Sequence, residues 1–340
     1  MDKKAFEIQF NWMFVLVAGA AILLFFTMIV VKQKSVSETS TKATVLKGVE
    51  ALISGASATI DTTKQESIPD SYIEIGCGRV SVGGVSRQYQ SLVLFAPESI
   101  KGNKLIWQTM ALSMPYRASN LLYMTTPHIR YILIGSNNLA KEVNKSLPPS
   151  LKKEFYESMP ITIRNQNNHK VKFIVFGNIN LDSIDLSNLQ NMQASDVTAI
   201  KINGDIEKGF IQFYEKSDDA WTMLGTSAYA GKSSLVGAVY ADTLEAYQCN
   251  MKNAFSRSKL VSEIYIGRTE KLLLSTTIPK CIVAYNNALS LLKKLNTTSY
   301  TLSKLSSSFN EAAMIEISNS AKLLSEENEA LQKFSCPLIY

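Results

Sequence analysis

A long apolar run opens the chain. The twenty residues 12–31 contain no ionisable side chain, and lysines stand on both sides of them. A helix of this length spans about 30 Å, the thickness of the hydrocarbon core of a bilayer, and pairs its backbone amides internally. Trp12 stands where an interfacial aromatic residue is expected. The pattern predicts a short N-terminal tail, 1–11, and a transmembrane helix, 12–31.

A cleaved secretory signal is the alternative interpretation of this run. The apolar region of such a signal is usually about 7–15 residues long and ends at small residues that are cleaved. The run in this chain is longer, and residues 31–35 offer no such cleavage site. We therefore expect a retained anchor.

Residues 32–69 are rich in Ser, Thr and Ala, and their apolar positions recur at helical spacing. These positions are Leu46, Val49, Ile53, Ala56 and Ile60. The spacing predicts a juxtamembrane helix with one modest apolar face, ended by Pro69 and Asp70. Such a helix either continues the membrane helix outward as a stalk or packs on the body.

Short apolar runs separated by Gly, Pro and Asn fill residues 70–233, and such runs are typical of strands. The predicted strands are Tyr72–Ile75, Arg79–Val82, Ser91–Phe95, Ile129–Ile134, Ile161–Arg164, Val171–Phe176, Val197–Ile202, Gly209–Tyr214 and Trp221–Leu224. Loops at Asn165–His169 and Lys216–Asp219 indicate two hairpins, and helices are expected over 138–146 and 184–192. Strands that alternate with helices favour a covered sheet, which the hairpins make mixed rather than parallel.

The pattern changes to helix over residues 234–340. Few helix breakers occur in 235–275, and neither Gly nor Pro occurs between Pro279 and Phe334. Leucines recur every three, four or seven residues, and Asn296–Ser299 is the expected interruption. Because the heptad repeat is not sustained, we expect packing on the body of the protein rather than a free coiled coil.

The fold class predicted from these patterns is α/β with a mixed sheet, an N-terminal transmembrane helix and a long C-terminal helical hairpin or bundle. The chain has 340 residues, a net charge of +6 and 19% charged residues. No run of Lys and Arg interleaved with aromatic residues follows the juxtamembrane region, which excludes a nucleic-acid footprint.

The segment Gly231-Lys232-Ser233 ends like a phosphate-binding loop. Such a loop needs two glycines separated by four residues, and the preceding glycine, Gly225, is one residue too far away. The segment is better interpreted as a strand-to-helix turn in which Ser233 or Ser234 caps the helix.

Asn178, Asn180 and Asp182 have the spacing of oxygen ligands in a calcium loop. The positions that need Gly and Glu hold Ser183 and Leu189, so a polar strand exit is the better interpretation.

The two histidines, His128 and His169, have no neighbouring His, Cys or carboxylate at ligand spacing, which disfavours zinc. A Ser/His/Asp triad with distant partners stays open, although no G-x-S-x-G elbow is present. We predict no catalytic, cofactor-binding or metal-binding residue and no cofactor.

Four cysteines, Cys77, Cys249, Cys281 and Cys336, follow the anchor, and none forms a C-x-x-C pair. They are candidates for two disulfides; the pairing we favour joins Cys249 to Cys281 and Cys77 to Cys336. The alternative is four reduced cysteines in the core.

The side of the membrane on which the body lies is not set by charge, because Lys3 and Lys4 balance Lys32 and Lys34. The even cysteine count and two sequons, at Asn144 and Asn296, permit disulfides and glycans. We therefore expect the N-terminus in the cytoplasm and the body outside it.

Residues 3–12 lead into the apolar helix, and the segments 114–117 and 120–123 are followed by Arg130-Tyr131. In these segments the chain resembles single-pass membrane-anchored proteins of archaea. The resemblance covers about a tenth of the chain. It implies a cell-surface protein of archaeal type and implies no activity.

The start also resembles a type IV pilin leader, which has a short basic peptide, a small residue, a Phe and then an apolar helix. Processing would fall between Ala5 and Phe6. Pilins have a glutamate at the fifth mature position, whereas this chain has Phe10 there and places Glu7 at the second. The resemblance implies filament assembly, which this departure puts in doubt.

Three functions follow from these features. The first is a membrane-anchored extracytoplasmic binding or structural module that meets a protein partner through its helical arm. The second is a pilin-like subunit of a filament or cell-surface assembly. The third is an enzyme or ligand receptor with a site at the carboxyl ends of strands, near Gly135–Asn138, Gly177–Asn180 and Asn203–Asp205.

Overall fold

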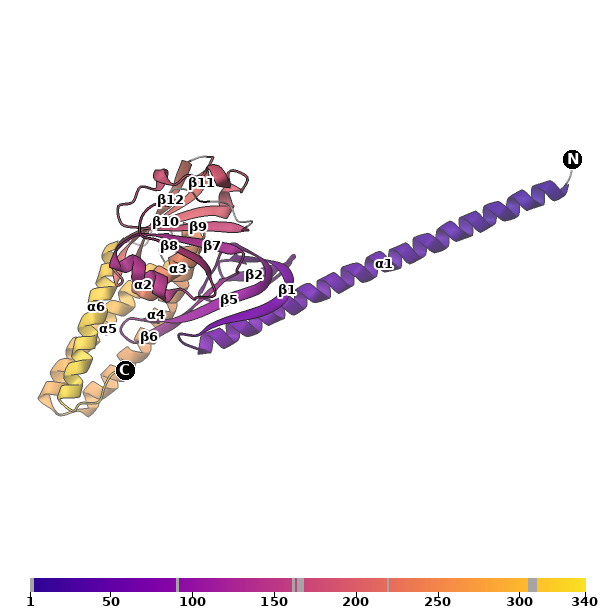
Figure 1. Cartoon of the computed structure of the whole chain (residues 1–340). Helices are drawn as coiled ribbons and strands as arrows, with labels where there is room; N and C mark the ends of the chain where they lie inside the picture. Colours follow the sequence, from indigo (N-terminus) through magenta and orange to yellow (C-terminus); the bar gives the residue numbers. More distant parts are fainter. Residues whose placement is uncertain (1–2, 90–91, 161–162, 164–167, 219, 305–310) are drawn as a thin grey trace.

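The computed structural model describes residues 3–89, 92–160, 163, 168–218, 220–304 and 311–340. It has a protruding N-terminal helix, a body of two six-stranded sheets and an arm of long helices (Figure 1). This confirms the predicted fold class, an α/β protein with mixed sheets, an apolar N-terminal helix and a C-terminal helical bundle.

Helix α1 (Lys3–Ala58) is continuous over 56 residues. Its segment Val15–Lys34 is apolar and long enough to cross a membrane, and none of it is buried. Further along, the side chains of Val45, Leu46, Val49, Ile53 and Ala56 are all buried against the first sheet. The helix therefore does both things that its sequence left open: it continues outward as a stalk, and its last turns pack on the body.

The helix ends at Ala58 rather than at Pro69 and Asp70, so the predicted boundary is wrong. Both residues lie inside strand β1 (Thr63–Gly76), where its pairing with β5 is interrupted between Ser67 and Ser71. Proline has no N–H to donate to a ladder, and an interruption of the pairing is a position that tolerates it.

The first sheet has the order β3-β2-β1-β5-β6-β4. Its other strands are β2 (Arg79–Val82), β3 (Val85–Gln88), β4 (Leu94–Phe95), β5 (Ser99–Ser113) and β6 (Arg117–Thr125). All neighbours are antiparallel except β4 and β6. The sequence patterns missed β5, which is the longest strand with 15 residues, and its neighbour β6.

The second sheet has the order β12-β11-β10-β9-β7-β8 and is mixed. Its strands are β7 (Ile129–Ile134), β8 (Lys152–Tyr156), β9 (Lys170–Phe176), β10 (Val197–Gly204), β11 (Lys208–Ser217) and β12 (Ala220–Ala230), with helix α2 (Asn138–Ser146) after β7. Strands β8, β7, β9 and β10 are parallel, and β10, β11 and β12 are antiparallel. The predicted hairpin of β11 and β12 is confirmed.

The other predicted hairpin, around Asn165–His169, is not supported by the pairing of β9, which is parallel to both of its neighbours. Most of its first strand, Ile161–Arg164, lies outside the described residues. The predicted helix 184–192 is wrong: short 3-10 turns, Leu181–Ser183, Ser187–Leu189 and Ala194–Asp196, connect β9 to β10. Local hydrogen bonds such as that from the Ser187 amide to the Asp185 carboxylate compete with a helix there.

Helix α3 (Lys232–Tyr240) contacts strands of both sheets. The arm follows, built from α4 (Leu244–Ser275), α5 (Pro279–Lys304) and α6 (Glu311–Lys333). Helix α5 continues through Asn296–Ser299, so the expected interruption there is wrong. The polar side chains are accommodated by bonds that leave the helix intact: Asn296 donates to the Lys259 carbonyl on α4, and Thr298 to the Glu316 carboxylate on α6.

Two cysteine pairs lie at disulfide distance, Cys77 with Cys249 and Cys281 with Cys336, each with a Cα–Cα separation of 5.9 Å. The pairing favoured from the sequence is therefore wrong. Cys249 stands at the beginning of α4 and Cys281 follows its end. Cys249 is the sixth residue of α4, and the 26 residues of helix from there to Ser275 span about 39 Å, beyond the reach of a disulfide.

Candidate functional site

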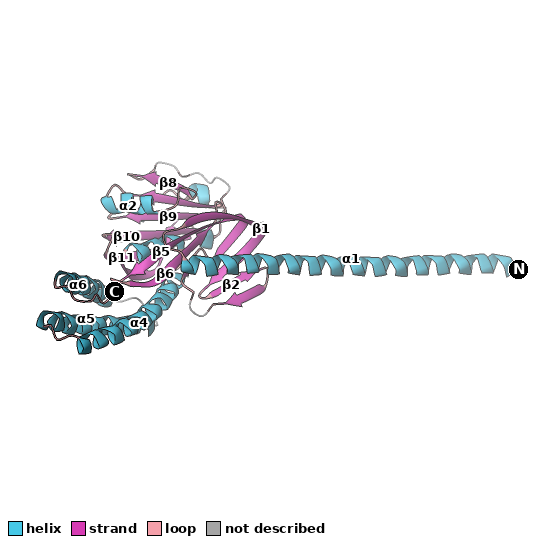
Figure 2. Ribbon diagram, turned by 90° about the horizontal axis from the view of Figure 1, so that it is seen from below, coloured by secondary structure: helices cyan, strands magenta, loops and turns pink. Residues whose placement is uncertain are grey.

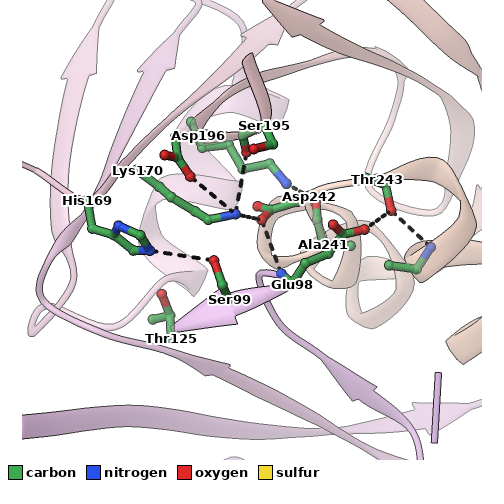
Figure 3. A network of polar contacts seen from close by, with 12 residues as sticks. Glu98, Ser99, Thr125, His169, Lys170, Ser195, Asp196, Ala241, Asp242 and Thr243 are labelled. Carbon is green, nitrogen blue, oxygen red and sulfur yellow. Dashed lines mark hydrogen bonds and ion pairs between the residues drawn. The ribbon is translucent and has the colours of Figure 1, made fainter. Parts of the chain in front are cut away.

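A buried ion pair lies where α3 ends between the two sheets (Figure 3). The Lys170 ammonium, at the start of β9, is 2.6 Å from the carboxylate of Asp242, which follows α3. Both side chains are almost completely buried. The same Asp242 carboxylate accepts the backbone N–H of Glu98 from the first sheet at 3.1 Å. The Asp242 carboxylate, which lies between α3 and α4, thus contacts a residue from each of the two sheets.

A second buried lysine, Lys172, lies beside this pair. Its ammonium donates to the backbone carbonyls of Ala238 and Ala241 at the end of α3. The unpaired carbonyls at the end of a helix carry partial negative charge and favour a cation. Burial nevertheless lowers the pKa of Lys172 to about 7; the nearby carboxylate of Asp242 raises it, and the Lys170 ammonium lowers it further.

The rest of this polar junction is partly exposed. The Thr243 hydroxyl caps α4 by accepting the Ala246 amide and donates to the Glu98 carboxylate at 2.9 Å. His169 Nε2 lies 3.5 Å from Ser99 Oγ, and burial lowers the pKa of His169. The Asp196 carboxylate is 4.0 Å from the Lys170 ammonium. Figure 3 shows both side chains.

The catalytic-triad hypothesis left open by the sequence can be judged on this geometry. Ser99 and His169 form a long contact, and the carboxylates around them are engaged with Lys170 rather than with the histidine ring. A triad needs a base oriented by a third group. The two histidines also meet through their backbones, since the His169 N–H donates to the His128 carbonyl. Among the described residues, the junction connects elements of both sheets and α3 through its ion pair and hydrogen bonds.

A large cavity, lined by none of the residues of this junction, lies along α6. It has a volume of about 910 Å³. Its walls are the β5–β6 hairpin (110–115), the β10–β11 turn (206–208), the turn into α3 (230–233) and α6 between residues 317 and 325. A smaller hollow of about 350 Å³ continues along α6 and shares Lys208 with the first. We call the two together the α6 groove.

The lining of the α6 groove is mixed. Apolar side chains come from Met110, Leu112, Met114, Ile206 and Ile317. Charged side chains of both signs stand among them: Asp61, Glu207, Lys208, Lys232 and Lys322. A groove of mixed polar and apolar lining suits an extended polypeptide, whose backbone needs donors and acceptors and whose side chains need apolar contact.

The segment Gly231-Lys232-Ser233 lies in this groove as a strand-to-helix turn, as expected, and not as a phosphate loop. Gly231 has a positive φ of 79° and precedes α3. Neither serine caps the helix in the usual way. Ser234 Oγ instead bonds the backbone N–H and C=O of Ala230 and is buried.

The carboxyl ends of the parallel strands were the predicted location of a ligand site. Asn203–Asp205 do line the smaller hollow of the groove. The other two segments are hydrogen-bonded to neighbouring strands. The Gly135 N–H donates to the Tyr156 carbonyl, and the Gly177 N–H donates to the Ile202 carbonyl. Of the three segments, Asn203–Asp205 thus lie at one of the cavities described above.

The remaining candidates have local structural roles. The Asn180 side chain accepts the Asp182 amide and begins a 3-10 turn, which is the polar strand exit expected. Among the described residues, no three His, Cys, Asp or Glu side chains are grouped to hold a metal ion. The sequon residue Asn144 lies in α2 and is half-buried, and the Asn296 amide faces α4. Glycosylation at these two positions stays a prediction.

Comparisons with family models, with curated proteins and with solved structures find no match to this chain.

Proposed function

We propose that this protein is a single-pass membrane-anchored binding or structural module whose body lies outside the cytoplasm and meets a protein partner. The observation that carries the proposal is the division of α1. One continuous helix has an exposed apolar segment of membrane-spanning length, and its last turns are buried against the first sheet.

The position of the body is supported by the cysteines. Four cysteines form two pairs at disulfide distance, and disulfides persist in oxidising compartments. One pair joins the β1–β2 turn to α4, and the other joins the beginning of α5 to the residues after α6. The pairs therefore fasten the arm at both of its ends.

The α6 groove is the surface we propose for the protein partner. It is formed jointly by the arm and the body, and its mixed lining suits an extended segment of a partner. Docking there would place the partner on the arm, as the helical pattern of the sequence suggested.

The test is site-specific photo-cross-linking in intact cells. A photoreactive residue replaces Lys322 in the groove, and a matched variant carries it at Lys141, an exposed lysine on α2. The expected result is a protein adduct from position 322 that is absent from position 141. Identical adduct patterns from the two positions would contradict a partner in the groove.

The anchor and its orientation need a separate measurement. A membrane-impermeant amine reagent added to intact cells should label exposed lysines of the body, and the chain should stay with the membranes in alkaline carbonate. Release by carbonate contradicts the anchor, and labelling that appears only after lysis contradicts the extracytoplasmic body.

A pilin-like subunit is the second candidate, because α1 has the form such a subunit needs. A helix whose apolar half protrudes and whose other half is held on a sheet can pack in the core of a filament. Sequencing the N-terminus of the mature protein distinguishes the candidates. A start at Phe6 favours the pilin-like subunit, and a start before it favours the unprocessed anchor.

A further inference from the structure

The arm ends in a surface that is apolar and basic at once. We call it the arm tip and define it as residues 271–280, at the turn from α4 to α5, and 333–338, after α6. Four large apolar side chains are exposed there: Leu274 is 88% exposed, Ile278 51%, Phe334 42% and Leu338 37%. Apolar residues gathered at one exposed end mark an interaction site more often than scattered single ones do.

The two segments form one surface. The Lys280 ammonium lies 5.3 Å from the centre of the Phe334 ring. The Arg268 guanidinium donates to the Leu338 carbonyl at 3.1 Å. The pair Cys281 and Cys336 holds the beginning of α5 against the chain that follows α6. The exposed apolar side chains are thus presented by a covalently fastened end and not by loose segments.

The charge of the arm tip has a single sign. It contains Lys271, Lys280 and Lys333 and no Asp or Glu. The neighbouring Glu270 is 3.7 Å from Lys293 on α5, which offsets its charge. On α6 the nearest carboxylate is that of Glu329, one turn before Lys333. Lysines around exposed Leu, Ile and Phe are the composition of segments that enter the interface of an anionic bilayer.

The shape of the tip favours lipid over protein. The apolar side chains stand at the end of a helical bundle, on a turn and on a terminal segment, and not along a groove. A protein partner would have to supply a complementary concave surface. A bilayer interface has no such requirement, because lipid headgroups rearrange around the inserted side chains.

The arm tip and the membrane-spanning segment lie at opposite ends of the molecule. In two views at right angles, α1 leads away from the body on one side and the arm leads away on the other (Figures 1 and 2). Since α1 is one helix from the spanning segment to the body, the tip does not reach the bilayer that holds α1.

We propose that the arm tip binds the surface of a second, anionic lipid bilayer, so that the protein bridges two membranes. The inference rests on the proposed membrane anchor and adds to it a lipid partner for the arm. The apolar side chains insert among the headgroups, and the three lysines are attracted to the anionic surface.

The test uses the full chain in donor vesicles of neutral phosphatidylcholine and measures the capture of fluorescent acceptor vesicles. With acceptors that contain about one third phosphatidylglycerol, capture should exceed that of pure phosphatidylcholine acceptors by about ten-fold, and about 0.5 M salt should weaken it. The double variant Leu274→Ser/Ile278→Ser should lower capture at least about five-fold.

The matched control is Leu260→Ser/Ile264→Ser, which removes two exposed apolar side chains from α4 nearer the body. It should leave capture unchanged. Replacing Lys271, Lys280 and Lys333 by Gln should abolish the preference for anionic acceptors.

Flotation of the chain with the donor vesicles reports the anchor independently. A chain that floats with the donors but captures no anionic acceptor overturns the lipid proposal alone, and a chain that does not float overturns the anchor.

The lipid proposal is also overturned if the substitutions at the arm tip leave vesicle capture unchanged. It is overturned as well if a protein binds the arm tip and no vesicles are captured.

Discussion

The contact of α1 with the first sheet is apolar, whereas the contact of α3 with the two sheets is organised around buried charges. Val45, Leu46 and Val49 bury side chains against strands β1, β2 and β3. At the end of α3, Lys170, Lys172 and Asp242 are buried instead. Fully buried aliphatic side chains stabilise by about 1.5–3 kcal/mol each. Buried charges contribute little net stability but strongly penalise the loss of one partner.

The difference explains what each interface can do. An apolar interface holds α1 without fixing the hydrogen-bond geometry of individual groups, which suits a stalk. The junction at Asp242 specifies which atoms meet: one carboxylate oxygen contacts the Lys170 ammonium and the Glu98 amide, and so fixes the relative position of both sheets.

The largest effect is expected from Asp242→Ala. The substitution leaves the buried Lys170 with the Ser195 carbonyl, 3.4 Å away, and the Asp196 carboxylate, 4.0 Å away, and it removes the acceptor of the Glu98 amide. We expect a loss of about 3–5 kcal/mol in the free energy of unfolding. Urea unfolding of the full chain in detergent micelles measures it. The control Asp182→Ala changes an exposed aspartate and should stay within about 0.5 kcal/mol. If the two variants lose the same free energy of unfolding, the buried ion pair at Asp242 does not contribute more to stability than an exposed aspartate does.

The apolar interface is tested by Leu46→Ala. Truncation of this buried side chain should cost about 2–4 kcal/mol and loosen the last turns of α1. Hydrogen exchange of residues 45–56 measures the loosening directly. The control, Leu16→Ala, truncates an exposed leucine of the same helix. If both variants leave exchange in 45–56 unchanged, the buried face does not hold α1 on the sheet.

The same two interfaces show which features a sequence can predict. Four of the five residues predicted for the apolar face of α1 are buried, because they recur at helical spacing; the fifth, Ile60, lies beyond the end of the helix and is exposed. Strand β7 was found with its exact bounds, because Ile129–Ile134 is a continuous apolar run closed by Gly135. Strand β5 was missed, because its first residues include Lys101, Gly102, Asn103 and Lys104 and carry no strand pattern.

The polar junction could not be predicted, because its members are distant in sequence. Lys170 and Asp242 are separated by 72 residues, and Glu98 is separated from Asp242 by 144. One local signal was present: Lys170 and Lys172 stand at alternate positions of an otherwise apolar strand. Lysines in a buried strand need partners, although the sequence does not say which. The α6 groove is equally non-local, since its walls come from five separate parts of the chain.

A smaller effect, dependent on pH, is expected from Lys172→Met. Burial holds the pKa of Lys172 near 7 in the folded chain, below its usual value of 10.5. Between these values the unfolded chain binds a proton that the folded chain does not, so stability rises with pH. Below about pH 7 both states bind it, and the cost of the buried charge is fully present. The variant lacks this titration.

The measurement is the free energy of unfolding of both proteins at pH 6, 7, 8 and 9. The stability of the natural chain relative to Lys172→Met should increase by about 1–3 kcal/mol from pH 7 to pH 9. Parallel stability curves would mean that Lys172 stays charged, held by the carbonyls of Ala238 and Ala241.

The smallest effect is expected from Ser99→Ala, which tests whether the junction has chemistry in addition to structure. Ser99 Oγ and His169 Nε2 are 3.5 Å apart, the edge of a hydrogen bond, and both residues are partly exposed. Removing the hydroxyl should change the free energy of unfolding by less than about 0.5 kcal/mol. A fluorophosphonate probe, which reacts with activated serines, should leave the natural chain unlabelled, because the carboxylates near His169 are bound to Lys170 and do not orient its ring. Labelling that Ser99→Ala and His169→Gln both abolish would turn this junction from a structural contact into a catalytic centre, and the contrast with the apolar interface of α1 would then be one of function as well as of construction.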